Sequence, residues 1–280
     1  MRIGVTAFLT DLSMPAPAFA VAAEERGYHS VYLPEHTHLP VSEANPPALV
    51  GGVDRQDYRR SLDPFVALAA AASVTQRIRL GTGVCLVAQH DPIVLAKTVA
   101  TLDRISEGRV VFGVGYGWNR REAADHGLDF SLRREVAREK LLCVQALWAS
   151  EEAEFHGRFV DLPPCYAWPK PVQTPRVPTL IGAAAGPRTF SAVAELADGW
   201  MPIGGAGAAA AMAGLRGAYE RAGRDPAGAQ TVVFGAVPDA GKLEHYREAG
   251  VTEVVLRVPS GPEHEMLASL DELSVYVTTA

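Results

Sequence analysis

The chain has 280 residues, of which 48% are hydrophobic and 21% charged, a composition typical of a globular protein. Its formal net charge of −6 argues against nucleic acid or an anionic membrane surface as the main partner. Three cysteines without C-x-x-C spacing (Cys85, Cys143 and Cys165) favour neither a disulfide framework nor a structural zinc site. The first apolar run is too short for a signal sequence, and no segment approaches a transmembrane length. We therefore expect a cytoplasmic protein.

The first half of the chain alternates predicted strands with predicted helices. The strands are near-continuous apolar runs at 2–8, 30–34, 77–84 and 109–115. Helical patterns follow Pro15 and the Asp-Pro pairs at 63–64 and 91–92, where an N-cap aspartate precedes a first-turn proline. A long helix is predicted at about 131–149.

The second half continues the same alternation. Strands are predicted at 178–183, 199–204, 231–237 and 253–258. Helices are predicted at about 187–197, 206–222, 239–249 and 262–274. Strands that are apolar throughout are typical of a parallel sheet with both faces buried.

Eight β/α units in this length predict an α/β protein with a (β/α)₈ TIM barrel. A Rossmann fold is disfavoured because no G-x-G-x-x-G follows the first strand. Two long spacers, at about 35–62 and 150–177, are interpreted as loop insertions, so that residues 1–280 form a single domain. Catalytic groups of such barrels lie where the strands end, and this directs attention to those positions.

The stretch "YLPEHTH" (32–38) lies at one of these strand ends and contains an H-x-H pair, His36 and His38. Two imidazoles with this spacing are suited to a metal. However, the ends of the later strands supply Gly, Ala, Tyr, Asn, Trp and Met rather than further ligands. We therefore predict that no metal is bound.

The segment "GAAAGPR" (182–188) suggests an anion site. Small residues precede a helix whose first turn contains Pro187, and the free backbone N–H groups of such a turn suit a phosphate. The alternative is an ordinary strand-to-helix turn.

Several segments together resemble one known family. They are "ExGYxSVYLPEH" (25–36), "RIRLGTGV…HDPIVLAKTVATLDRISEGRVVFGVGYGWN" (77–119), "WPKPVQ" (168–173) and "AELADGWMP" (194–202). The chain resembles the luciferase-like monooxygenase superfamily over residues 1–204, and within it the branch that uses the deazaflavin coenzyme F420. The resemblance implies a (β/α)₈ barrel, in agreement with the predicted strands.

The resemblance also implies roles for particular residues. The bond Gly83–Val84 matches a non-proline cis peptide that backs the flavin ring, Tyr116 and Asn119 match residues beside the ring or its phosphate arm, and Ala184, Ala185 and Gly186 match the phosphate loop. Tyr116 stands where some sugar-phosphate dehydrogenases of the family have a glutamate, and a phenol is a poor carboxylate substitute at neutral pH. Sugar phosphates are therefore a poor expectation for the substrate.

His36 matches the histidine of the family's acid–histidine pair, and an imidazole can exchange a proton while hydride moves to or from the deazaflavin. We expect His36 and Glu35 to be catalytic, with Glu35 orienting His36 or holding its charge. The alternative is that His36 only hydrogen-bonds the cofactor. His38 is expected to be a solvated loop residue and His90 a structural one.

The resulting prediction is an F420-dependent oxidoreductase that transfers hydride between the deazaflavin and a small organic substrate. One alternative is a two-component monooxygenase that uses reduced FMN and oxygen, and another is a flavin-binding barrel without turnover. The resemblance further implies a homodimer. The substrate itself depends on the two variable insertions and is not predicted.

Overall fold

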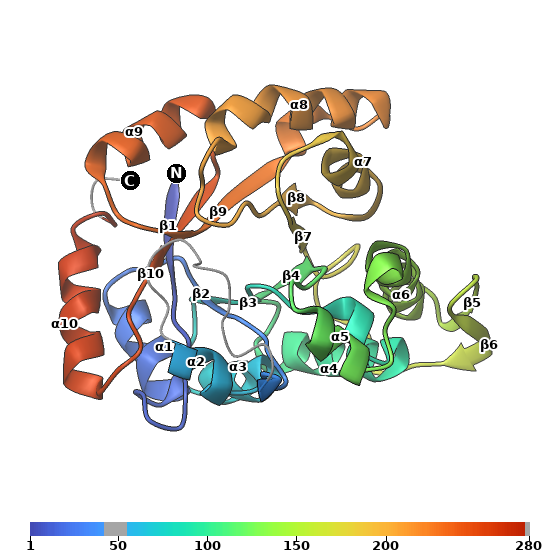
Figure 1. The fold of residues 1–280 in the computed structure, drawn as a ribbon, viewed down its shortest axis with the longest axis horizontal. Coiled ribbons are helices and arrows are strands. Elements are labelled where there is room, and N and C mark those ends of the chain that lie inside the picture. The colour runs from blue at the N-terminus through green and yellow to red at the C-terminus, as the bar shows by residue number, and fades with distance from the viewer. Residues whose placement is uncertain (42–54, 278–280) are drawn as a thin grey trace.

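The computed structural model describes residues 1–41 and 55–277, and these residues contain a closed barrel of eight parallel strands (Figure 1). The order around the barrel is β1-β10-β9-β8-β7-β4-β3-β2. The strands are β1 (Arg2–Thr6), β2 (Ser30–Leu33), β3 (Arg79–Thr82), β4 (Val110–Gly115), β7 (Thr179–Gly182), β8 (Gly199–Trp200), β9 (Gln230–Ala236) and β10 (Glu253–Arg257). Each lies inside or within one residue of a predicted strand, so the predicted barrel is confirmed.

The strands are apolar throughout because both of their faces are covered. All six residues of β4 and all four of β2 and β7 are buried, between the barrel interior and the surrounding helices. Strand β1 pairs with β10 over five residues, from Arg2 opposite Glu253 to Thr6 opposite Arg257. The first and last strands therefore close the barrel side by side.

Helices surround the barrel in the order that the sequence predicts. They are α1 (Ala16–Glu25), α3 (Pro64–Ala72), α4 (Pro92–Ile105), α6 (Arg133–Ala149), α7 (Pro187–Leu196), α8 (Ala208–Arg221), α9 (Ala240–Ala249) and α10 (Glu263–Ser274). The Asp-Pro pairs act as predicted, since Asp63 accepts a hydrogen bond from the Val66 N–H at 2.8 Å and Asp91 accepts from Ile93 and Val94 at 2.9 Å. None of the helices in the described ranges combines the length and apolarity needed to cross a bilayer.

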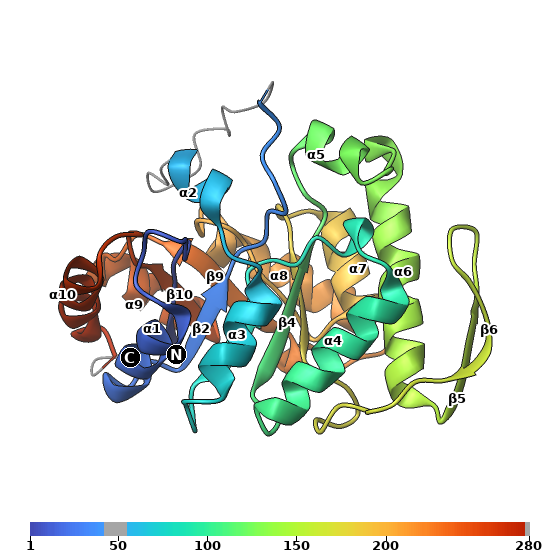
Figure 2. The same ribbon diagram turned by 90° about the horizontal axis from the view of Figure 1, so that it is seen from below.

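Within the described residues, two short α-helices were not predicted, and both lie at the end of the barrel where the strands finish. Helix α2 (Arg55–Arg60) belongs to the first insertion, whose residues 42–54 lie outside the described part of the chain. Helix α5 (Arg120–Asp125) follows β4. Figure 2 shows α2 and α5 on the same side of the barrel, above the ends of the strands.

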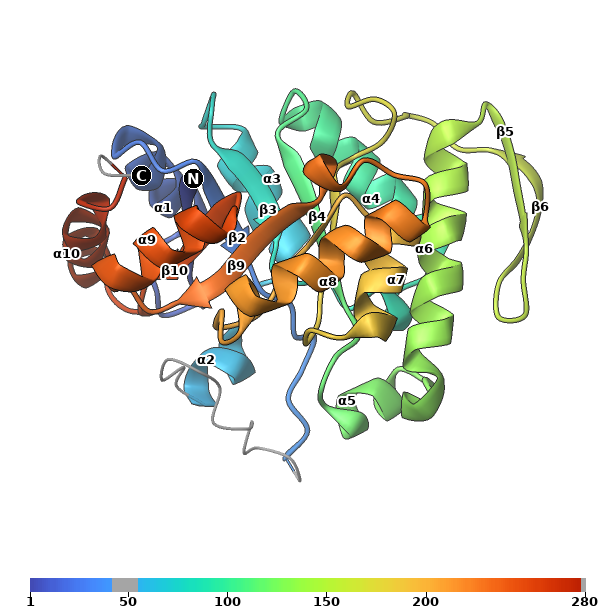
Figure 3. The same cartoon turned by 90° about the horizontal axis from the view of Figure 1, so that it is seen from above.

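The second insertion, predicted as a loop, contains a β-hairpin. Strand β5 (Glu152–His156) pairs antiparallel with β6 (Asp161–Tyr166), and Figure 3 shows this hairpin outside α6, away from the barrel. Pro163 and Pro164 lie within β6. Proline cannot donate to a ladder, but it is tolerated in an edge strand, and both strands of a two-stranded sheet are edges.

Candidate active site

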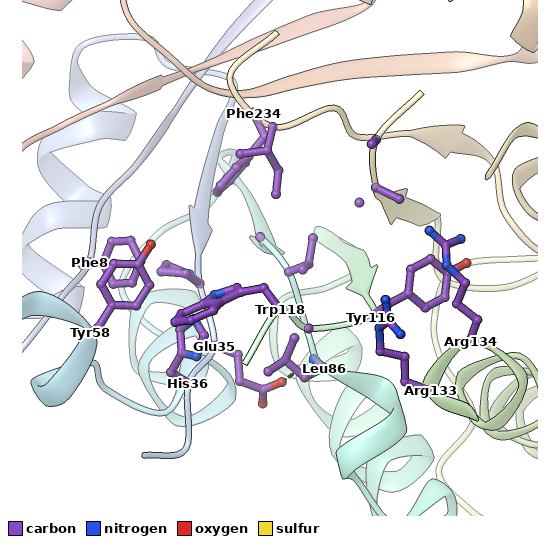
Figure 4. A pocket seen from close by; sticks show the side chains of 18 of the residues that line it. Phe8, Glu35, His36, Tyr58, Leu86, Tyr116, Trp118, Arg133, Arg134 and Phe234 are labelled. Carbon is purple, nitrogen blue, oxygen red and sulfur yellow. Dashed lines mark hydrogen bonds between the residues drawn. The ribbon is translucent and has the colours of Figure 1, made fainter. Parts of the chain in front are cut away.

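A cavity of about 250 Å³ lies at the carboxyl ends of the strands (Figure 4). Its walls come from the ends of all eight barrel strands and from helices α2 and α6. The lining residues are Phe8, Pro34, Glu35, His36, Tyr58, Gly83, Val84, Leu86, Tyr116, Gly117, Trp118, Arg133, Arg134, Gly182, Ala183, Ala184, Ile203, Phe234 and Arg257. This is the position at which barrel enzymes carry their chemistry.

Val84 forms part of the cavity wall, and neighbouring glycines make room for its side chain. A Cβ atom at Gly115 would lie 2.3 Å from Val84 Cγ2, and one at Gly182 would lie 2.6 Å from Val84 Cγ1. The Gly83–Val84 peptide bond is cis, as the family resemblance implies. The glycines of β4 and β7 thus let the chain at 83–84 lie closely against both strands.

One end of the cavity is aromatic. The Tyr58 ring lies 4.7 Å from Phe8, 5.1 Å from the His36 imidazole and 6.1 Å from Trp118, measured between ring centres. His36 is also 5.7 Å from Trp118. Figure 4 shows these four rings gathered on one side of the cavity. Because the Tyr58 and Trp118 rings flank the imidazole, His36 is held between apolar faces.

The partner of His36 is a carboxylate from the distant helix α5. His36 Nδ1 lies 3.0 Å from Glu122 Oε2, and the other oxygen of Glu122 accepts a hydrogen bond from the Thr37 N–H at 3.2 Å. The side chains of His36 and Glu122 are only 7% and 1% exposed. A buried carboxylate on Nδ1 fixes the ring orientation and directs Nε2 away from it, which suits proton exchange at Nε2.

Glu35 has different partners, and its expected pairing with His36 is not what the structure contains. Glu35 Oε2 accepts the Leu86 N–H at 2.5 Å, and Oε1 lies 2.8 Å from His90 Nε2. Although the two residues are adjacent in sequence, Glu35 contacts the loop after β3 while His36 contacts α5. Burial disfavours the charged imidazole, but the Glu35 carboxylate outweighs this and raises the pKa of His90. The structural role expected for His90 agrees with these contacts.

Glu35 and His90 lie next to a buried thiol. The ligand-type atoms of Glu35, Cys85 and His90 all lie within 4.8 Å of one another. Burial, and then the nearby Glu35 carboxylate, raise the pKa of Cys85 well above its usual value. The thiol is therefore protonated, and the Glu35 carboxylate is already hydrogen-bonded to Leu86 and His90. We interpret these three residues as a hydrogen-bonded cluster. That the protein binds no metal stays a prediction.

The opposite end of the cavity is cationic. The Arg134 guanidinium lies 4.3 Å from the centre of the Tyr116 ring, and Arg133 lies 3.8 Å from that of Phe130. Figure 4 shows Tyr116, Arg133 and Arg134 together, across the cavity from the aromatic end. Arg133 Nε is buried, and no group in the described part of the chain hydrogen-bonds it. Burial, followed by the neighbouring Arg134 and Arg120, lowers the pKa of Arg133. An anion at this end would supply the missing acceptor for Arg133 Nε and would reduce the repulsion between Arg133 and the neighbouring arginines.

The structure separates the remaining predicted cofactor residues. Tyr116 and Ala184 line the cavity, whereas Asn119, Ala185 and Gly186 are not among its lining residues. Asn119 is buried and caps α5, where its Oδ1 accepts from the Arg121 and Glu122 N–H groups at 3.0 Å each. Gly186 is the N-cap of α7, and no side chain caps that helix. The first turn of α7 therefore keeps the free N–H groups that the sequence predicts.

His38 does not line the cavity, but it has contacts. Its Nε2 lies 3.2 Å from Asp125 Oδ2, and its Nδ1 lies 2.9 Å from the Thr37 hydroxyl oxygen. The same hydroxyl lies 2.7 Å from His126 Nε2. With 40% of its side chain exposed, His38 is the partly solvated loop residue that the sequence predicts, and it joins this loop to the end of α5.

Sequence reasoning missed five residues of the site: Tyr58, Glu122, Arg133, Arg134 and Arg257. Glu122 follows Asn119 by three positions, and the pattern N-x-x-E marks a helix start, so α5 could have been recognised. Arg257 is a charged residue within an apolar predicted strand, near its carboxyl end, which is a signal for a barrel site. Nothing local distinguishes Tyr58, whose burial depends on the fold.

The sequence also matches a known protein family. Residues 15–252 match the family described as luciferase-like monooxygenase, which is well over half of the chain. The protein belongs to this family. It is therefore an enzyme of the luciferase-like monooxygenase class, and the resemblance seen in the sequence is confirmed.

Among its relatives, an uncharacterised protein of Mycobacterium tuberculosis is 42% identical over 277 residues, covering 98% of both chains. An F420-dependent hydroxymycolic acid dehydrogenase of the same organism is 27% identical over 228 residues, covering 79% of this chain and 59% of its own. Among solved structures, an F420-dependent secondary alcohol dehydrogenase in complex with an F420-acetone adduct has a TM-score of 0.79 at 18% identity, covering 99% and 98% of the two chains. At 18% identity, the similarity to the alcohol dehydrogenase structure shows a shared fold only.

Proposed function

We propose that this luciferase-like enzyme transfers hydride between coenzyme F420 and a small organic substrate. The observation that carries the proposal is a cavity with an unsatisfied cationic end and a His–Glu pair at its aromatic end, in a chain whose relative is named as F420-dependent. When bound, the deazaflavin would supply a carbon that accepts or gives hydride. Binding, proton exchange and the exclusion of water would be the roles of the surrounding side chains.

The cationic end fits the phosphate of such a cofactor. Arg133 offers a buried Nε without a partner, Arg134 lies beside Tyr116, and α7 begins without a side-chain cap. Guanidinium groups and free helix N–H groups are the usual ligands of phosphate oxygens. Ala184, Ala185 and Gly186 would approach the phosphate through their backbone, and Val84 would pack against the ring. Contact of Asn119 with the cofactor stays a prediction, because Asn119 Oδ1 is used as a cap.

His36 is proposed to hold or release the proton that accompanies hydride transfer. Its Nδ1 is engaged by Glu122, so that Nε2 is the atom available to a substrate oxygen or carbon. Phe8, Tyr58 and Trp118 would exclude water from this end. Glu35 is proposed to support the reaction indirectly, by fixing the loop that contains Leu86.

A second candidate is a monooxygenase that uses reduced FMN and oxygen. The family is described as monooxygenases, and FMN also carries a phosphate suited to the cationic end. A flavin-binding barrel without turnover is the third candidate. We further propose that residues 1–280 form one domain with two insertions, and that the protein is a cytoplasmic homodimer.

Titration of the purified protein with F420 and, separately, with FMN tests the proposal. Fluorescence quenching is expected to give tighter binding for F420 than for FMN. Tight binding of FMN without any response to F420 would overturn the proposed function. F420 binding without hydride transfer to any alcohol, carbonyl or enoic substrate would favour the flavin-binding barrel.

A matched pair of charge reversals tests the cationic end. Arg134→Glu is expected to weaken F420 binding by about tenfold or more, because it places a carboxylate beside the phosphate. Arg104→Glu, at an exposed position of α4, makes the same change in net charge away from the cavity and should leave the affinity unchanged. Equal effects of the two variants would show that only net charge matters.

A further inference from the structure

Arg257 is a cavity residue that the proposed chemistry leaves unused. It is the last residue of β10, at the carboxyl end of the barrel, and it lines the same cavity as His36. Its Nη1 is buried and has no hydrogen-bond partner among the residues that the structure describes. A buried, unsatisfied guanidinium N–H is costly, because its desolvation is not offset by a bond. Such a group in a ligand cavity indicates a polar partner that comes with the ligand.

Within residues 1–41 and 55–277, no carboxylate forms an ion pair with Arg257. Burial is the larger influence and lowers the pKa of Arg257, while Tyr58 acts in the opposite direction. Among the described residues, no carboxylate exerts a charge interaction on this guanidinium. Tyr58 cannot replace one, since burial raises the pKa of Tyr58 to about 12 and keeps the phenol neutral at physiological pH.

The backbone of β9 makes room for the guanidinium. A Cβ atom at Gly235 would lie 3.1 Å from Arg257 Nη2. Gly235 also has a φ of +67°, a conformation that side chains disfavour. A larger residue here would be strained and would press on the guanidinium. The end of β9 is therefore shaped to let Arg257 lie over it.

Arg257 belongs to the aromatic end of the cavity and not to the cationic end. Its charge interacts with Tyr58, whose ring contacts Phe8 and His36. The other arginines of the cavity, Arg133 and Arg134, lie across it beside Tyr116. A ligand at the aromatic end thus meets apolar rings, one imidazole and one guanidinium.

We propose that Arg257 selects a substrate with a carboxylate group on a small apolar body, and that it binds this carboxylate through paired N–H donors. One guanidinium matches one negative charge and the two oxygens of a carboxylate. The described lining residues place no second guanidinium at this end to match a phosphate dianion. Phe8, Tyr58 and Trp118 suit the apolar body, and the cavity of about 250 Å³ limits its size. The inference rests on the proposed function, because it names the substrate class for the same cavity.

Binding of small acids and their neutral amides tests this inference without turnover. Benzoate and butyrate are titrated by calorimetry into the protein, alone and saturated with F420, with benzamide and butyramide as matched neutral probes. At least one acid is expected to bind about tenfold or more tightly than its amide, the usual scale for a hydrogen bond to a charged group. Equal binding of acids and amides, or no binding of either acid, would overturn the inference. Phenyl phosphate is titrated as well. If it binds more tightly than either acid, and if this binding depends on Arg257, the proposed carboxylate ligand is wrong and the ligand is a phosphate dianion.

Variants at Arg257 assign the effect. Arg257→Met is expected to lose the preference for the acid, and Arg257→Lys to retain part of it, because the charge remains while the paired geometry is lost. Arg104→Gln is the matched surface control and should behave as wild type. If Arg257→Met does not fold, the proposal is tested by Arg257→Lys and by the comparison of acid with amide in the wild-type protein. Unchanged benzoate binding in folded Arg257→Met would contradict the proposal.

F420 titration of the same variants separates this inference from the proposed function. Arg257→Met is expected to bind F420 as wild type does. If wild type fails to bind F420, the proposed function is wrong, while the acid preference of the protein alone still reports on Arg257. A loss of F420 affinity of about tenfold in Arg257→Met would show that Arg257 serves the cofactor, and would overturn the substrate assignment.

Discussion

Two acid–histidine pairs with buried carboxylates lie at the carboxyl end of the barrel, and the two histidines have different surroundings. Glu122 and His36 join the end of β2 to α5, and His36 lies among the rings of the cavity. Glu35 and His90 join the end of β2 to the loop before α4, and Glu35 also holds the Leu86 N–H. Neighbours in sequence, Glu35 and His36 belong to different pairs. This difference is why we propose proton chemistry for the first pair and loop support for the second.

Replacement of His36 is expected to have the largest effect. His36→Ala should reduce hydride transfer by roughly 10²-fold or more, the usual scale for loss of a general acid or base, while F420 affinity stays within about tenfold. Single-turnover rates with any substrate identified by screening provide the measurement. Unchanged rates would remove His36 from the chemistry and leave it as a cofactor contact.

Replacement of Glu35 is expected to act on stability rather than rate. Glu35→Gln should lower the free energy of unfolding by about 1–3 kcal/mol, because a buried carboxylate that serves two partners is replaced by a weaker acceptor. Urea unfolding, with hydride transfer measured on the folded protein, gives both quantities. A large fall in rate at unchanged stability would instead make Glu35 catalytic.

Glu122→Gln tests the pair of Glu122 and His36 with a smaller change than His36→Ala. The amide can still accept from the Thr37 N–H, but it no longer carries a charge beside the imidazole. Hydride transfer should fall about tenfold, and F420 affinity should change little. A variant that loses F420 binding but keeps its rate when saturated would show that the pair positions the cofactor.

The smallest expected effect is a pH dependence of stability from the second pair. Because the pKa of His90 is raised in the folded protein, its stabilisation is complete below its ordinary value of 6.5 and is lost as pH rises through the raised pKa. Unfolding free energies of wild type between pH 6 and pH 9 should therefore fall slightly relative to His90→Gln. A parallel pH profile for the two proteins would show that Glu35 and His90 are not coupled in this way.

The sequence predicts the barrel because its strands are apolar and punctuated by caps and glycines, features that act within a few residues. It does not predict the hairpin of β5 and β6, because Pro163 and Pro164 argue against a strand unless that strand is known to be an edge. Secondary structure thus follows from local pattern except where the sheet environment overrides it.

The candidate site divides in the same way. His36, Glu35, Tyr116 and Ala184 stand at strand ends and could be selected from the sequence. The partner of His36 could not, since Glu122 lies 86 residues away and only the side-by-side order of β2, β3 and β4 brings the two together. Arg257 likewise lines the same cavity as Tyr58 because the last strand, β10, closes the barrel beside β1, which in turn pairs with β2. Pairing across strands is a property of the fold and not of either segment.

A structure of the protein crystallised with F420 would test the central claim most directly. The account predicts the deazaflavin ring against Val84, its phosphate at Arg133, Arg134 and residues 184–186, and the His36 imidazole beside the carbon that exchanges hydride. Arg257 should face the space left for substrate. A cofactor bound with its phosphate at the aromatic end, or excluded from the cavity while FMN enters it, would contradict the account.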